Sequence, residues 1–338
     1  MNAKSITLMR WALTFCVSVS GVVAYAQDSG RRDNFSPTNK HCRYCSLRYE
    51  DLSTRDLSEV DLTGAFMHGA NLSWSNLKNG HFSSANLISV RMEWADFDGA
   101  NFANAYLEDA AMFRSTFRKA DFRMANLSRA NLSRSELAGA NLVTAILRGA
   151  DLSGARINNA EMRQADLTGA TLEGARVRES DLQSATLDRA NLQGCDLTNS
   201  DLSGASVIGA SFASTYIHFA NFRKANLTGS DFRFALIDAV NFDGANLSKA
   251  DFTGAVLRNS VFKGANLCQA KLPDGSLGYC EIPSAQTAQT AQPVQPAPAP
   301  EIYTPPAQIP QAGNPPALYE PPAAIDNIKP ESPAQKTL

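Results

Sequence analysis

The chain has 338 residues, enough for one large domain or two, and its six cysteines are too few for a disulfide-dense scaffold. Its formal net charge of −2 creates no field that would attract nucleic acid or anionic lipid. We therefore expect no nucleic-acid partner.

The first 26 residues have the organisation of a secretory signal peptide. Two basic residues precede an apolar stretch at 11–23, and residues 24–26 read Ala-Tyr-Ala, the small-x-small pattern that signal peptidase cleaves. Cleavage is predicted after Ala26. We expect an exported mature protein, periplasmic or secreted, in an oxidising compartment. No other apolar run is long enough to span a bilayer, so we expect no membrane span after cleavage.

Residues 52–272 repeat a large apolar residue at every fifth position. All 45 of these apolar centres are Leu, Phe, Met, Ile or Val. The position two residues before the centre holds only Ala, Ser, Gly, Val, Thr or Cys from Val60 to Ala270. A period of five fits neither an amphipathic helix nor a half-buried strand. Such a long phase predicts a solenoid, whose units bury their apolar sides only by stacking on their neighbours.

The segments ADLTGATLEGA, ANLTGSDF and ANLSKADFTGAVL follow the pattern A-(D/N)-L-x-x. The repeat resembles that of the pentapeptide repeat family over about 220 residues. The resemblance implies an all-β fold, a right-handed quadrilateral β-helix with one pentapeptide on each side. At about 4.8 Å per layer, the repeats give about 11 coils and a rod about 50 Å long. We expect a linker at 27–41 and the solenoid at 42–282.

The phenylalanines at the apolar centres support a coil of 20 residues. They form four series that step by 20: Phe82, Phe102 and Phe122; Phe97 and Phe117; Phe212, Phe232 and Phe252; and Phe222, Phe242 and Phe262. Rings in successive coils gain from offset contact, so like residues should form ladders. The last two series together also fit a period of ten, and the test therefore supports four sides without proving them.

Cysteines lie at both ends of the repeat. For Cys42 and Cys45 three interpretations stay open: a disulfide that pins the first coil, which export favours; two buried thiols; or a redox or metal site, for which one CxxC is weak evidence. A second disulfide could join Cys268 to Cys280 and secure the C-terminal end. Cys195 replaces an interior alanine and is expected to be buried.

Residues 283–338 differ in composition from the rest of the chain. They contain 14 prolines, whereas none lies between Thr38 and Leu272. A disordered, Pro/Ala/Gln-rich tail is predicted. The motif YTPPAQI at 303–309 returns as YEPPAAI at 319–325, through low-complexity drift or as a bivalent docking peptide.

No catalytic constellation is evident in the sequence. The histidines His41, His68, His81 and His218 fall on different sides or coils of the solenoid, and there is no GxSxG, Walker or dinucleotide motif. Asp residues before the centres are expected to bond the local backbone at corners rather than to pair as carboxylates. We therefore expect a protein that is not an enzyme and has no cofactor and no metal.

Two exposed patches are candidate binding surfaces. The first, which we call the Trp/Arg stripe, consists of Trp74, Trp94, Arg114, Arg134, Arg91 and Phe113. Trp and Arg are enriched at interface hot spots, although stacked rings and cations can also merely stabilise neighbouring coils. The second, the C-terminal patch, consists of Tyr216, Leu236, Val256, Phe219 and Phe234. It could be a homodimer contact, a partner site or a seat for the tail.

These features favour an exported interaction or scaffolding module with an unknown protein partner. The resemblance suggests an alternative, a DNA mimic that inhibits gyrase. That role needs an acidic surface in the cytoplasm, whereas residues 46–272 contain 25 acidic and 23 basic residues. A third hypothesis is binding to the envelope or a glycan, since the aromatic rings of the stripe can stack on sugar faces.

Overall fold

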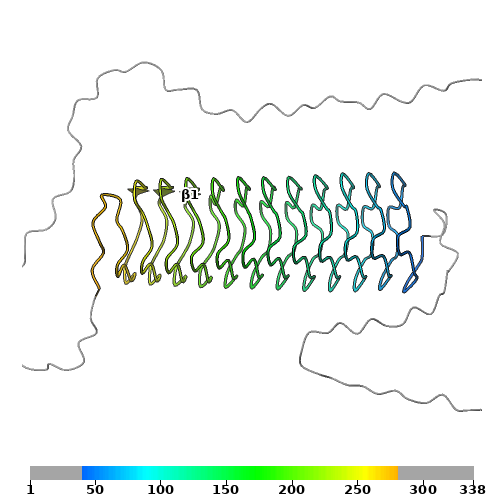
Figure 1. Cartoon of the computed structure of the whole chain (residues 1–338), viewed down its shortest axis with the longest axis horizontal. Coiled ribbons are helices and arrows are strands. Elements are labelled where there is room, and N and C mark those ends of the chain that lie inside the picture. The colour runs from blue at the N-terminus through cyan, green and yellow to red at the C-terminus, as the bar shows by residue number, and fades with distance from the viewer. Residues whose placement is uncertain (1–39, 281–338) are drawn as a thin grey trace, which may run out of the picture. The chain divides into compact units, whose positions relative to one another are not determined.

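The computed structural model describes residues 40–280, which form a right-handed four-sided β-helix (Figure 1). The expected signal peptide, most of the linker and the tail lie outside the described residues. Parallel bridges join residues 20 apart, as in the series Asp61, His81 and Asn101. The predicted fold class and the 20-residue coil are thereby confirmed.

Most sides of the coil pair with the next coil through a single bridge. On one side near the C-terminal end, three short strands form a parallel sheet in the order β1-β2-β3. Their bounds are β1 Tyr216–His218, β2 Leu236–Asp238 and β3 Val256–Arg258. In each strand the middle residue points into the solenoid, and the first and third point outward.

The interior consists of the apolar centres and the small residues that precede them by two positions. Because the walls are close, the centres stack directly on their equivalents one coil away. The rings of Phe82 and Phe102 lie 4.8 Å apart between centroids, and those of Phe102 and Phe122 lie 4.9 Å apart. The expected ladders of phenylalanine rings are therefore present.

Each corner of the coil is a tight turn whose last exposed residue has a positive φ. The N–H of Ala65, for example, donates to the carbonyl of the centre Leu62, and Gly64 between them has a φ of +64°. This is the geometry of a type II turn, which favours Gly or Asn at that position. Asp and Asn before the centres bond the local backbone, as expected: the N–H of Thr63 donates to Asp61 Oδ1 at 3.2 Å.

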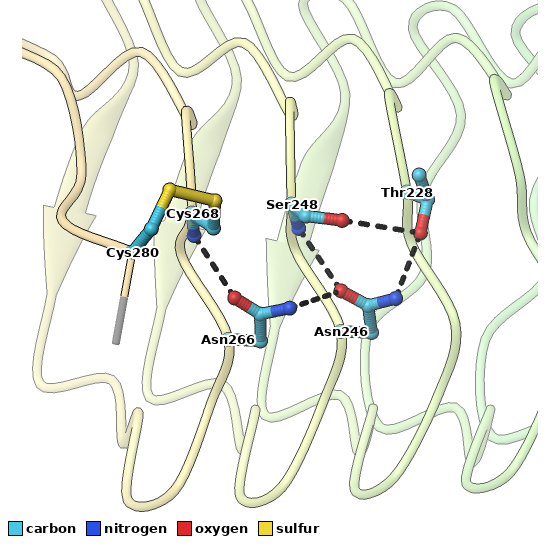
Figure 2. The surroundings of a disulfide bond; sticks show 6 residues. All are labelled: Thr228, Asn246, Ser248, Asn266, Cys268 and Cys280. Atoms are coloured by element: carbon cyan, nitrogen blue, oxygen red, sulfur yellow. Dashed lines mark hydrogen bonds between the residues drawn. A yellow bond between two sulfur atoms is a disulfide. The ribbon is translucent and has the colours of Figure 1, made fainter. Parts of the chain in front are cut away.

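Disulfides lie at both ends of the solenoid. Cys42 is bonded to Cys45 in the buried first coil, and Cys268 is bonded to Cys280 (Figure 2). Cys195 is free and fully buried, and burial raises the pKa of its thiol. The described residues contain no helix that could cross a membrane.

The regular coil ends earlier than the five-residue phase. That phase places Leu277 at an inward centre, but its side chain is 61% exposed. After Leu272 the chain turns at Pro273 and returns, so that Leu277 forms an antiparallel bridge with Lys271. We call residues 273–280 the C-terminal strap.

Candidate binding surface

In four successive coils, the left-handed corner position is occupied by residues of the Trp/Arg stripe: Trp74, Trp94, Arg114 and Arg134. Their φ values lie between +57° and +64°. This backbone conformation is costly for residues with a Cβ, and the position projects the side chain into solvent. Trp74 is 60% exposed and Trp94 is 41% exposed. Two large aromatic side chains therefore stand where the turn favours Gly or Asn.

Part of the stripe forms a continuous stack of Trp74, Trp94 and Arg114. The Trp74 and Trp94 rings are parallel within 4°, with centroids 5.0 Å apart. The Arg114 guanidinium carbon lies 4.6 Å from the Trp94 centroid, on the coil that follows Trp94. Phe113 meets Trp94 edge-on, with ring centroids 6.0 Å apart at an angle of 89°. Such contacts stabilise neighbouring coils and also hold the rings in one orientation.

Trp94 is thus covered on both ring faces, by Trp74 and by Arg114. Among the described residues, Trp74 stacks on no ring other than Trp94 and contacts no cation. The face of Trp74 that points away from Trp94 therefore has no ring or cation against it among the described residues.

The other end of the stripe is basic. Arg114 and Arg134 follow one another in the same column, and Lys119 lies around the corner. Within residues 40–280 none of these three cations has an acidic partner. Neighbouring arginines do have one: Arg129 pairs with Asp109 at 2.7 Å. Like charges stacked in adjacent layers repel, so an approaching anionic group would stabilise this end.

Arg91 belongs to the stripe but is not part of the stack. Its Nε lies 3.6 Å from Glu93 Oε1, and the hydroxyl of Ser73 donates to the other oxygen of Glu93 at 2.6 Å. The acid therefore neutralises Arg91 and leaves the basic end to the other three cations.

The C-terminal patch lies on the side that borders the corner of the stripe. Tyr216, Leu236 and Val256 are the first residues of β1, β2 and β3 and are in register with one another. Phe234, 68% exposed, stands at the same corner as Trp94, 140 residues or seven coils further on; Phe219, 58% exposed, stands at the opposite corner of that side. The two patches therefore meet the same corner of the rod but lie seven coils apart.

Two charged residues beside this patch were not identified from the sequence. Asp238 and Arg258 end β2 and β3 and point outward next to the apolar row. Only the strand register identifies them, because it pairs Asp238 with Arg258 and places both beside Leu236 and Val256. The five-residue pattern alone treats these positions as ordinary polar corners.

The described residues do not bring together a catalytic or metal-binding cluster. Residues 40–280 contain no group of three His, Cys, Asp or Glu side chains that could hold a metal ion. The histidines remain apart: His218 lies 3.4 Å from Asp238, and His68 contacts Tyr49 at the other end of the solenoid.

Comparison with known proteins identifies the repeat. The family model described as pentapeptide repeats matches eight copies, at residues 41–73, 56–93, 67–102, 91–127, 125–164, 165–204, 195–233 and 235–272. A search of curated proteins finds no match.

Several solved structures are similar to this chain. HetL, a protein involved in heterocyst differentiation regulation from the cyanobacterium Nostoc, is 26% identical with a TM-score of 0.43, over 70% of this chain and 92% of HetL. The plasmid-mediated fluoroquinolone resistance protein QnrB1 is 20% identical with a TM-score of 0.30, over 64% of this chain and 89% of QnrB1. Rfr23 from the cyanobacterium Cyanothece is 27% identical with a TM-score of 0.20, over 33% of this chain and 63% of Rfr23.

Proposed function

The chain belongs to the pentapeptide repeat family, and from that premise we propose that it is an exported, non-enzymatic module that binds a protein partner through the Trp/Arg stripe. The observation that carries the proposal is the stacked Trp74–Trp94 pair, exposed at two left-handed positions that favour smaller residues. An exposed aromatic pair beside unpaired arginines has the composition of an interface hot spot.

The geometry favours a protein over a glycan. Sugar rings stack on free aromatic faces; both faces of Trp94 are covered, and Trp74 leaves a single face that no described ring or cation covers. The guanidinium donors of Arg114 and Arg134, next to the exposed indoles, suit peptide carbonyls and carboxylates. We propose that the partner presents an acidic surface to the basic end of the stripe.

Export is supported by the signal-like N-terminal sequence and by the two disulfides, which persist in oxidising compartments. The balanced charge of residues 46–272 gives no support to a DNA mimic, which needs a strongly acidic surface.

The test is affinity capture from envelope and cytoplasmic fractions of the source cells, with the purified full chain as bait. The variant is Trp74→Asn/Trp94→Asn, because Asn suits the left-handed turn position. Met124→Asn is the matched control, since Met124 is 58% exposed at the same corner position of another side.

We expect a saturable partner in the envelope fraction that the wild type and Met124→Asn retain, and that the double Trp variant loses at least tenfold. Circular dichroism establishes that all three proteins are folded. Equal retention by all three proteins, or binding to purified envelope polysaccharide instead, contradicts the proposal.

A further inference from the structure

We propose that the C-terminal patch is a dimer interface, in which two copies of this chain pack side by side with their rods antiparallel. The patch interrupts the repeat, since its apolar residues follow a column whose earlier members, from Asp56 to Asp196, are all polar. Tyr216 is 43% exposed and Val256 is 42% exposed, on the one side where the described backbone forms three consecutive strands. A flat apolar face of this kind suits sheet-on-sheet packing.

The face carries two parallel outward rows. One row is apolar and consists of Tyr216, Leu236 and Val256. The other row consists of His218, Asp238 and Arg258. Layers in each row are about 4.8 Å apart. The second row therefore alternates an acid and a base at the spacing of one coil.

The charged row has one cation without a partner. Asp238 is contacted by His218 Nε2 at 3.4 Å and accepts a hydrogen bond from Asn259 Nδ2 at 3.0 Å. Arg258 is exposed and has no acidic partner among residues 40–280. A second copy can supply that partner.

Only one of the two simple twofold arrangements matches these rows. A twofold axis parallel to the rod places the apolar row of one copy against the charged row of the other. A twofold axis across the rod, between the levels of β2 and β3, keeps each row opposite itself and reverses its direction. Leu236 then faces Val256 of the second copy, and Asp238 faces Arg258 of the second copy, twice by symmetry. The charge complementarity thus selects an antiparallel dimer.

The strap stays outside this contact, because after Pro273 it returns along Lys271 and Ala270 on another side of the rod. The segments that face each other are therefore the coils of β2 and β3, roughly 10 Å of rod. An interface of this length is below the standard size, so we expect a reversible dimer that forms at high protein concentration.

Sedimentation equilibrium of the purified full chain over a wide concentration range tests the proposal. We expect the average mass to rise from one copy toward two. Leu236→Asn, which restores the usual polar residue, should weaken association at least tenfold. Ile146→Asn is the matched control, because Ile146 holds the same repeat position on another side and is 38% exposed; its association should be unchanged.

Charge reversal tests the orientation. Arg258→Asp and Asp238→Arg should each weaken association, and the double variant should restore it because both intermolecular pairs are re-formed in the opposite sense. A wild type that remains monomeric at all concentrations overturns the dimer. A folded double variant without restored association overturns the antiparallel register. Trp74→Asn/Trp94→Asn should dimerise normally, which separates this interface from the partner site of the stripe.

Discussion

The left-handed corner position is shared by the most exposed aromatic residues of the two patches, Trp74 and Phe234. It points the side chain away from the solenoid and along the rod, so a large ring at this position covers the corner of the next coil. Phe234 illustrates the consequence: a Cβ at Gly254, 20 residues later, would lie 2.8 Å from its ring. Tyr44 and Tyr49 cover Gly64 and Gly69 in the same way. Where a glycine follows an aromatic corner residue by one coil, the ring therefore occupies the space that a Cβ would need there.

We expect Gly254→Ala to destabilise the protein more than Gly229→Ala. Both glycines have φ near +70°, so both changes incur the backbone cost of about 1 kcal/mol. Only Gly254 has a ring against it, whereas nothing lies within 4 Å of the Cβ position at Gly229. Urea unfolding measures the difference, and Phe234→Asn should abolish it. Equal costs for the two alanine variants would show that the ring does not rest on Gly254.

A second prediction at the scale of the residue concerns the stability of the protein at low pH. Burial alone raises the pKa of Asp251, but hydrogen bonds from Thr253 and the ion pair with Lys271 outweigh it and lower this pKa to about 2. An unfolded Asp has a pKa of about 3.9. The carboxylate therefore stabilises the fold above about pH 4, and that contribution is lost as the pH falls from 4 to 2.

Asp251→Asn should consequently lower stability at pH 7 and have little effect at pH 2, measured by urea unfolding at each pH. Asp151→Asn is the control, because Asp151 holds the same position on the same side and accepts the N–H of Ser153 at 2.9 Å, but forms no ion pair with a described residue. A pH-independent difference between wild type and Asp251→Asn would refute the assignment.

At the scale of the element, the last coil depends on the C-terminal strap. The strap returns along the final layer, where the Gly278 N–H donates to the Ala270 carbonyl at 2.8 Å. The disulfide from Cys268 to Cys280 closes this loop next to a ladder of amides (Figure 2). In that ladder Asn266 Nδ2 donates to Asn246 Oδ1 at 3.1 Å. The strap therefore has one covalent and several weaker attachments.

Replacing both cysteines, as Cys268→Ser/Cys280→Ser, should loosen the strap and leave the central coils intact. A disulfide that closes a loop of this size contributes about 3 kcal/mol. Hydrogen exchange should therefore accelerate at Leu272 and Gly278, whose amides bond within the strap region, but not at Phe122. Unchanged exchange at the strap would mean that the noncovalent contacts suffice to hold it.

At the scale of the whole molecule, the sequence predicts the solenoid well because every coil obeys the same local rule. The spacing of Phe82 and Phe102 was sufficient to propose stacked coils, since inward centres pack on their equivalents in the coils before and after them. The end was harder to predict: Leu277 keeps the phase but has no further coil to stack on, so it is exposed. The five-residue phase predicts burial only where a neighbouring coil covers the residue, so the prediction fails at the last coil.

The binding surface was only partly accessible from the sequence. The column of Trp74 and Trp94 followed from the 20-residue coil. The covering of Trp94 by Arg114 depends on side-chain conformation, and the absence of an acidic partner for Lys119 among the described residues depends on charges from different sides of the rod. A five-residue pattern does not encode either of them.

Binding through one corner of the rod can be mapped directly in cells. A photoreactive phenylalanine analogue would replace one residue at each of the four corners in turn: Trp74, Met124, Glu179 and Lys249, all left-handed in the structure. If the Trp/Arg stripe is the partner site, irradiation should yield a single discrete crosslinked product from position 74 and none from the other three. Comparable products from all four corners, or a product only from a corner without the stripe, would contradict it.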